Sequence, residues 1–404
     1  MRILVISSKF PFPLKDGGSI ATFALISGFA KQNNQVFLLS FNTKKHLVQA
    51  KDISHNLFDQ IEYSLVELDT NPGFVSATIN LLFSKWPYIL IRFKNSKFEI
   101  ELVEILNKHQ FDVVQIEGLY MLQYLEIIRG KSSAVIAYRP HNIEYQIWDG
   151  LSRKGTSILK KLYFKILSRR ILKYELTILN AYDLILPISI EDADFYHRSG
   201  NIKPAIVIPT GIEIQKFANA TGQLTNPSIF FIGSLEWLPN QEGIIWFLNH
   251  CWSILLNKFP NLKWYIAGRN APVSLIKKFS KPGIVWAGEI ENTSEFIKDK
   301  SIMIVPLFSG SGMRIKILEA FSHAKPIVST TLGARGTMAI DNENIFLANT
   351  PQKFVDQIGC LLEQGQIYKN ISTNGYEHAR KNFDNNIISK ALSNFYKQHT
   401  TFNI

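Results

Sequence analysis

The segment Ser309–Thr330, SGSGMRIKILEAFSHAKPIVST, combines a loop of small residues with two cations and a carboxylate. It follows the apolar run Ser301–Phe308, which predicts a buried strand, and it opens a helical pattern. Backbone N–H groups of such a loop, together with the positive end of a helix, form a site for anions. We therefore predict an anion-binding loop at Ser309–Gly312.

The charged residues after this loop predict the chemistry of the ligand. Arg314 and Lys316 in the first turn oppose the helix macrodipole, and a bound anion would reverse that effect. Gly312, Lys316, Glu319 and His323 share one helical stripe, with Glu319 about 10 Å along the axis from Gly312. We expect a phosphate at the loop and a ribose diol at the Glu319 carboxylate. The alternative is an exposed Lys316–Glu319 ion pair, worth a few tenths of a kcal/mol.

Two successive strand–helix series must position these residues. Near-continuous apolar runs are typical of parallel strands that are covered on both faces. The predicted strands are Arg2–Ser7, Gln35–Phe41, Phe111–Glu117, Ala134–Tyr138 and Asp183–Ser189, then Ser228–Ser234, Leu262–Gly268, Gly283–Gly288, Ser301–Leu307 and Lys325–Thr330. The chain is therefore predicted to be α/β, with two Rossmann-like domains whose parallel sheets face each other across a cleft.

The segment Ile208–Pro227 is rich in Gly, Pro, Asn and Thr and has weak periodicity, so it predicts the domain boundary. We expect an N-terminal domain at 1–207 and a C-terminal, ligand-binding domain at 208–384. Residues 385–404 are expected to form a helix that crosses back to the first domain, because they have no strand of their own.

Three features of the first domain follow predicted strands, where ligands bind in open α/β sheets. Gly17 and Gly18 follow the first strand, and they either admit a phosphate or form an ordinary turn. His141 lies on a polar loop and either faces the cleft or caps the next helix through Asn142. Glu117 ends its strand and is either a functional or a solvated carboxylate.

Composition limits the function classes. The net charge of +11 favours an anionic partner, namely nucleic acid, a membrane surface or a phosphorylated substrate, but no nucleic-acid-binding signature is present. Cys251 and Cys360, far apart, predict neither a disulfide framework nor a zinc site. The first apolar run is too short for a secretion signal, so we expect a cytoplasmic protein. The acidic clusters that bind Mg²⁺ are missing, and we expect no metal.

The segment Arg153–Lys173, RKGTSILKKLYFKILSRRILK, has eight cations and no acid. Its interleaved apolar residues predict a basic amphipathic helix. Such a helix either lies on an anionic membrane surface or packs its apolar stripe on the first domain with the cations in water. The first interpretation makes the protein peripheral on the inner face of the membrane.

The segment Gly310–Gly336, GSGMRIKILEAFSHAKPIVSTTLGARG, resembles the donor-site motif of family 4 retaining glycosyltransferases (group 1), which have the GT-B fold. It is most similar to the branch with G-x-G-x-R-x-K-x-L-E-A. Phe231–Leu248 and Arg139–Trp148 also resemble that branch. The resemblance implies that Glu319 binds the ribose of a nucleotide-sugar, and it places a glycine loop at Gly17 and Gly18.

The resemblance further implies that His141 lies near the reacting sugar. Glu117, at the end of its strand, is an analogous candidate on the acceptor side. The chain departs from the family at Ser311, where a Glu usually stands, and at Ser234, where an Arg usually binds the diphosphate. We infer that Arg314 and Lys316 replace that cation. The predicted donor-binding set is Ser311, Gly312, Met313, Arg314, Lys316 and Glu319.

The predicted function is a retaining, metal-independent glycosyltransferase of the hexosyltransferase class that needs no cofactor. It would move a sugar from a nucleotide diphosphate donor to a glycan or lipid-linked acceptor in cell-surface polysaccharide synthesis. Two alternatives stay open, a nucleotide-sugar epimerase of the same architecture and a noncatalytic nucleotide- or glycan-binding protein.

Overall fold

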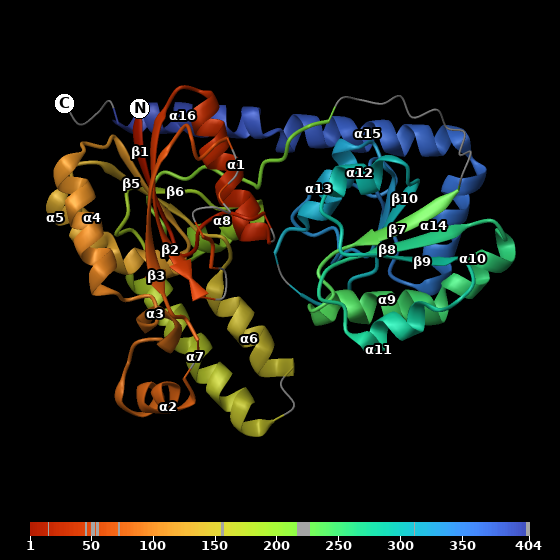
Figure 1. Cartoon of the computed structure of the whole chain (residues 1–404), viewed down its shortest axis with the longest axis horizontal. Helices are drawn as coiled ribbons and strands as arrows, with labels where there is room; N and C mark the ends of the chain where they lie inside the picture. Colours follow the sequence, from red (N-terminus) through yellow and green to blue (C-terminus); the bar gives the residue numbers. More distant parts are fainter. Residues whose placement is uncertain are drawn as a thin grey trace. The chain divides into compact units, whose positions relative to one another are not determined.

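The computed structural model describes residues 1–14, 16–44, 47–49, 53, 56–71, 73–154, 157–215, 227–310 and 312–400. The chain forms two compact units (Figure 1). The first unit comprises Met1–Gly211 and Ile388–Ile404, and the second comprises Ile212–Ile387.

The first unit contains a six-stranded parallel sheet in the order β3-β2-β1-β4-β5-β6. This is the doubly wound order, in which the chain direction across the sheet switches between the first and fourth strands. β1 and β4 are adjacent, with Ile3 opposite Val113. The strands are β1 (Arg2–Ser7), β2 (Gln35–Thr43), β3 (Glu62–Leu68), β4 (Val113–Glu117), β5 (Val135–Arg139) and β6 (Leu184–Ile185).

Helices connect these strands because parallel strands need crossover connections. The α-helices of the first unit are α1 (Gly17–Lys31), α2 (Phe74–Phe83), α3 (Tyr88–Ile91), α4 (Ser96–Lys108), α5 (Leu125–Lys131), α6 (Glu144–Lys154), α7 (Ile158–Thr177) and α8 (Ile190–Arg198), with a 3₁₀ helix η3 (Leu119–Tyr124).

The second unit repeats the same topology, with a parallel sheet in the order β12-β11-β10-β7-β8-β9. Its switch point therefore lies between β7 and β10. The strands are β7 (Ser228–Ile232), β8 (Lys263–Ala267), β9 (Ile284–Gly288), β10 (Ile302–Val305), β11 (Ile327–Ser329) and β12 (Phe346–Leu347). The helices are α9 (Leu238–His250), α10 (Trp252–Lys258), α11 (Val273–Ile276), η4 (Lys277–Phe279), α12 (Thr293–Lys298), α13 (Ile315–Ser322), α14 (Pro351–Glu363) and α15 (Gly365–Phe383).

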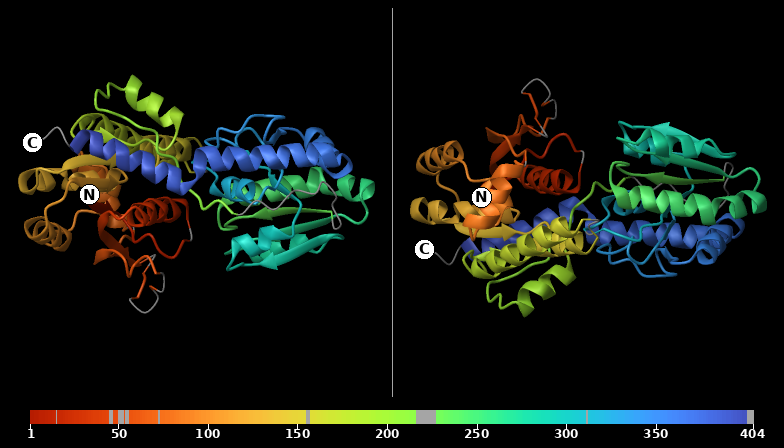
Figure 2. Two further views of the ribbon diagram at one scale, coloured as in Figure 1. Left: turned by 90° about the horizontal axis from the view of Figure 1, so that it is seen from above. Right: turned by 90° about the horizontal axis from the view of Figure 1, so that it is seen from below.

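The last helix, α16 (Asn385–Thr400), runs along the first unit (Figure 2). Its residues Ile388, Leu392 and Tyr396 lie at i, i+4 and i+8 and are buried in the core of that unit. None of the helices in the described residues has both the length and the apolar character that crossing a bilayer requires.

The prediction of an α/β chain with two parallel sheets is confirmed. Two strands were not predicted. β3 is an edge strand with exposed residues at Glu62, Tyr63 and Glu67, so it lacks the continuous apolar run of the other strands. β12 has only two residues and offers no periodicity.

Candidate functional site

The switch point of the second sheet brings the loop after β10 next to the end of β7. Lys316, on α13, donates from Nζ to Asn240 Oδ1 at 3.2 Å and lies 4.0 Å from the centre of the Phe231 ring. A Cβ added to Gly233, directly after β7, would lie 3.4 Å from Lys316 Nζ. Lys316 Nζ thus lies near Gly233, the residue before Ser234, where the resemblance expects an arginine.

Lys316 and Glu319 lie one turn apart on α13 and both are partly buried. Burial, and then the charge of Arg314, lowers the pKa of Lys316 to about 7. Burial alone raises the pKa of Glu319 to about 7. No ion pair joins these two described residues, so the alternative of an exposed Lys316–Glu319 pair is wrong. The site therefore presents a cation and a carboxylate to a ligand rather than to each other.

Arg314 is buried and lies against its own loop. Its Nη1 donates to the Gly312 carbonyl at 2.7 Å, and its guanidinium lies 5.0 Å from the centre of the Trp237 ring. Gly310 has φ 102°, and a Cβ there would meet the Trp237 ring at 2.5 Å. Burial, and then the charge of Arg335, lowers the pKa of Arg314 to about 10, so Arg314 is cationic at neutral pH. The loop geometry thus depends on Arg314, and its contact with a phosphate stays a prediction.

α13 is shorter than the helical stripe predicted from sequence. Gly312 has φ 82°, and the helix begins only at Ile315, with His323 as its C-cap. Gly312 and His323 therefore lie outside α13, and the predicted helical stripe is wrong at both ends. Lys316 and Glu319 lie within α13 with the predicted spacing. Ser311 lies outside the described residues. Met313 lies beside Gly336, where an added Cβ would be 3.5 Å from Met313 Cβ.

At the switch point of the first sheet, Glu117 ends β4 and is buried. It accepts hydrogen bonds from Thr22 Oγ1 at 3.0 Å and Arg139 Nη1 at 3.2 Å, and also from Gln115 Nε2. Glu117 also contacts His141 Nε2. Burial raises the pKa of Glu117, but the Arg139 and His141 charges and these hydrogen bonds outweigh it and lower the pKa to about 2. Glu117 is therefore a buried, ionised carboxylate that accepts hydrogen bonds, and the prediction of a solvated carboxylate is wrong.

His141 is oriented by this carboxylate. Because ionised Glu117 only accepts hydrogen bonds, His141 directs an Nε2 hydrogen toward it, whether the imidazole is neutral or protonated. A Cβ added to Gly18 would lie 3.4 Å from His141 Nδ1. The structure thus brings Gly18, Glu117 and His141 together, and Gly17 begins the same helix turn, α1.

The proposed capping role of His141 and Asn142 is wrong. The first amides of α6, those of Glu144 and Tyr145, donate instead to the Glu175 carboxylate at 3.0 and 3.3 Å. His141 is therefore not needed to begin that helix.

Several residues of the two sites were not predicted. Tyr396 on α16 donates its hydroxyl to Gln115 Oε1 at 2.7 Å and so extends the Glu117 network to the last helix. Gln115 and Arg139 were detectable as polar positions within buried strands, whereas Tyr396 had no local signal. The unpredicted residues are Thr22, Gln115, Arg139 and Tyr396 in the first unit, and Trp237 and Asn240 in the second.

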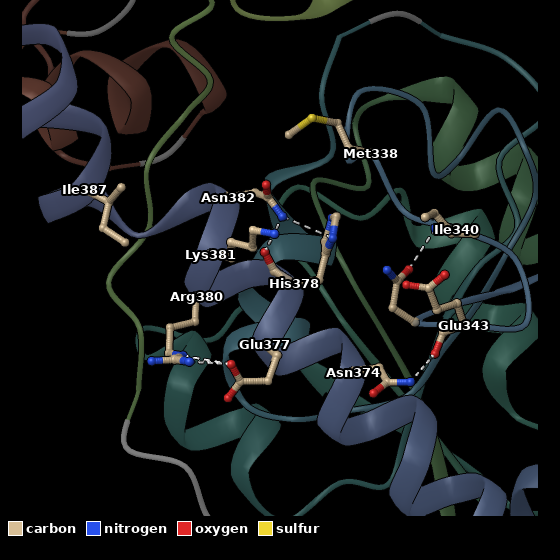
Figure 3. A pocket seen from close by; sticks show the side chains of 11 residues that line it. Met338, Ile340, Glu343, Asn374, Glu377, His378, Arg380, Lys381, Asn382 and Ile387 are labelled. Atoms are coloured by element: carbon tan, nitrogen blue, oxygen red, sulfur yellow. Dashed lines mark hydrogen bonds and ion pairs between the residues drawn. The ribbon is translucent and has the colours of Figure 1, made fainter.

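A separate groove of about 720 Å³ lies in the second unit between the segment after Gly336 and the end of α15 (Figure 3). Its polar groups bind one another: Arg380 pairs with Glu377 at 2.6 Å, and Asn374 donates to the Glu343 carbonyl at 2.9 Å. None of the predicted site residues lines it. We assign the groove no function.

Comparisons with known proteins identify related sequences and folds. Residues 226–364 match the family model for glycosyl transferases group 1, and this range contains Lys316 and Glu319. An uncharacterized 44.6 kDa protein in the cps region of Klebsiella pneumoniae is 22% identical over 98% of this chain and 100% of its own length.

Solved structures show the same fold. The Anabaena protein HepE, crystallised with UDP and in another crystal with UDP-glucose, superposes with TM-scores of 0.69 and 0.66. In its complex with UDP the identity is 14%, over 98% of this chain and 100% of HepE. Sucrose-phosphate synthase from Thermosynechococcus elongatus superposes with a TM-score of 0.72 at 14% identity over all of both chains. The chain therefore has the fold of GT-B glycosyltransferases and carries a glycosyl transferases group 1 domain at residues 226–364.

Proposed function

We propose that the protein is a retaining glycosyltransferase that transfers a sugar from a nucleotide diphosphate donor to a glycan or lipid-linked acceptor in cell-surface polysaccharide synthesis. One observation carries the proposal. Lys316 and Glu319 lie one helical turn apart at the switch point of the second sheet, and neither is neutralised by the other. A cation and a carboxylate in this arrangement fit the diphosphate and the ribose of one nucleotide.

The negative charge that develops on the leaving diphosphate is the main charge that the protein would have to stabilise in this reaction. When the bond from the sugar anomeric carbon to the diphosphate oxygen breaks, the diphosphate takes the electron pair. Lys316, Arg314 and the amides of Gly310 and Gly312 would stabilise that charge. These groups would supply positive charge beside the diphosphate without a metal ion.

His141 would orient the reacting sugar in this scheme. Its Nδ1 lies beside Gly18, so a sugar hydroxyl that approaches the glycine backbone would donate to Nδ1 of the neutral imidazole or accept from Nδ1 of the protonated one. Glu117 would keep the imidazole in that orientation. The acceptor hydroxyl would attack from the face that the diphosphate leaves and pass its proton to the departing oxygen, so no protein nucleophile is required.

The comparisons support the choice of substrates. HepE crystals contain UDP and UDP-glucose, which favours a nucleotide-sugar donor. The relative from the cps region favours a role in polysaccharide synthesis. We propose a cytoplasmic protein that associates peripherally with the inner face of the membrane through Arg153–Lys173.

A noncatalytic binding protein is the second candidate. It is favoured by Ser234, which replaces the expected arginine, and by Arg314, which binds its own loop. A thermal-shift screen across UDP-, GDP- and ADP-sugars would identify the donor, and the labelled donor would then be followed with and without acceptors. Transfer of label supports the enzyme, stabilisation without any turnover supports the binder, and a changed sugar would indicate an epimerase.

A further inference from the structure

The first unit has an apolar helix face that points to solvent. α2 contains no charged residue, and Val75, Ile79, Leu82 and Phe83 recur at i, i+4, i+7 and i+8, which places them on one face of the helix. Such a face normally packs on a core. Here these four side chains are 68%, 54%, 69% and 85% exposed. The apolar face of α2 is therefore exposed, whereas such a face is usually buried in a globular domain.

The beginning of α7 has a similar surface with added charge. Ile158, Leu159 and Leu162 are 83%, 79% and 57% exposed, whereas Leu167 and Ile171, further along the helix, are buried in the core. The later part of α7 thus packs its apolar residues on the first unit, whereas the first part leaves its apolar residues exposed, and membrane binding stays a prediction. The exposed cations of α7 are Lys160, Lys161, Lys165, Arg169 and Lys173. None of the five pairs with an acid in the part of the chain that the structure describes.

The two helices are fixed to each other. Arg170 donates to the Asn80 and Leu81 carbonyls at 3.2 and 2.8 Å and so binds the last turn of α2 to α7. The Trp86 ring lies 5.5 Å from that of Tyr174. Figure 1 shows α2 and the start of α7 projecting from the first unit, away from its sheet. These contacts hold the end of α2 against the second half of α7, and the exposed apolar and basic residues of both helices lie in this projecting part of the first unit.

We propose that α2 and the first half of α7, the docking surface, bind an anionic lipid bilayer. The apolar side chains would enter the boundary between headgroups and acyl chains, and the cations would contact lipid phosphates. Each Lys or Arg near an anionic leaflet strengthens binding by about fivefold. The positive charge of the docking surface favours an anionic bilayer over a second copy of this chain, because a second copy would bring like charges together. The proposal deepens the proposed function, since it would bring the protein to a lipid-linked acceptor.

Co-sedimentation with vesicles tests the docking surface without any donor or acceptor. We expect the full chain to bind vesicles of equal parts phosphatidylcholine and phosphatidylglycerol, and to bind less at high salt. The double variant Leu82→Ser/Phe83→Ser should bind at least about tenfold more weakly, because two large apolar side chains no longer leave water. Lys160→Glu/Lys161→Glu should bind at least about tenfold more weakly as well.

Matched controls lie elsewhere on the chain. Ile202→Ser removes an apolar side chain that is 83% exposed, and Lys277→Glu/Lys278→Glu makes the same charge change on exposed lysines of the second unit. Both should bind within twofold of the unchanged protein. Absence of binding by the unchanged protein, or equal binding by the Leu82/Phe83 variant, would overturn the proposal. So would a dimer in sedimentation velocity that this variant alone abolishes.

Transfer to a soluble acceptor separates this proposal from the proposed function. The docking-surface variants should retain that transfer, because α2 and the start of α7 do not include the proposed site residues. Vesicle binding without any transfer would contradict the proposed function and leave the docking surface standing.

Discussion

Glu319 is the residue whose role can be tested most simply. We expect Glu319→Ala to weaken nucleotide-sugar binding by roughly 1.5–3 kcal/mol, since hydrogen bonds to a charged acceptor are lost. The fold should remain intact, because the carboxylate makes no hydrogen bond or ion pair with another described residue. Calorimetry measures the affinity, with the exposed Glu289→Ala as control. Unchanged affinity would remove Glu319 from the site.

The pKa values of Lys316 and Glu319 predict how binding depends on pH. Lys316, with its pKa lowered to about 7, loses its charge as pH rises, which weakens the diphosphate contact. Glu319, with its pKa raised to about 7, is protonated as pH falls, which weakens the ribose contact. Affinity for a nucleotide-sugar should therefore be highest near pH 7. Lys316→Met should flatten the alkaline side in calorimetry, and Glu319→Gln the acid side. A profile that neither variant changes would contradict both roles.

The Glu117–Arg139 pair predicts a stability effect. Glu117→Gln leaves the fully buried Arg139 without its counter-charge, so we expect a loss of about 3–5 kcal/mol in the free energy of unfolding. Glu117→Gln/Arg139→Met should recover part of that loss, and exposed Glu104→Gln should change little. Urea unfolding measures the stability of each variant. Arg139→Met alone completes the double-mutant cycle, and strictly additive effects of Glu117→Gln and Arg139→Met in the double variant would show that the pair is not coupled.

The same pair fixes a pH dependence of stability. The folded pKa of Glu117, about 2, lies below its ordinary value of 4.5. Glu117 therefore stabilises the fold above about pH 4.5, and this stabilisation is lost as pH falls toward 2. Glu117→Gln should be less sensitive to acid than the unchanged protein.

At the scale of elements, the donor loop depends on one glycine. Gly310→Ala forces an alanine into φ 102° and presses its Cβ against the Trp237 ring, which should move the loop and weaken donor binding. Gly288→Ala provides the matched control, because Gly288 also has positive φ, at 74°, but open space around its Cβ position. Both variants should lose about 1–2 kcal/mol of stability from backbone strain. Only Gly310→Ala should lose affinity in calorimetry, and equal losses in both would contradict the contact.

The elements show what a sequence can and cannot predict. Buried parallel strands were predictable because both faces are covered, which leaves continuous apolar runs. β3 was not, because an edge strand with one exposed face contains charges. The start of α13 was placed too early because the positive φ of Gly312 is a property of the folded loop. Lys316 and Glu319 were selected from their spacing in the sequence. The contacts of Asn240 with Lys316 and of Trp237 with Arg314 arise only through the fold.

At the scale of the whole molecule, both units use the same doubly wound order, and the candidate residues of each lie at its switch point. The repeated strand–helix alternation predicted this arrangement. The sequence did not predict the network that joins α16 to Glu117, because Tyr396 and Gln115 are 281 positions apart. Long-range hydrogen bonds of this kind follow from packing, which a local pattern does not contain.

Sugar transfer from a labelled nucleotide-sugar tests the central claim most directly. The donor that gives the largest thermal shift would be incubated with candidate glycan and lipid-linked acceptors, and the product would be analysed for the label and its anomeric configuration. We predict labelled product with retained configuration, no loss of rate in the presence of a chelator, and a large loss in Glu319→Ala. Product with inverted configuration, or a Glu319→Ala variant as active as the unchanged protein at limiting donor, would contradict the account.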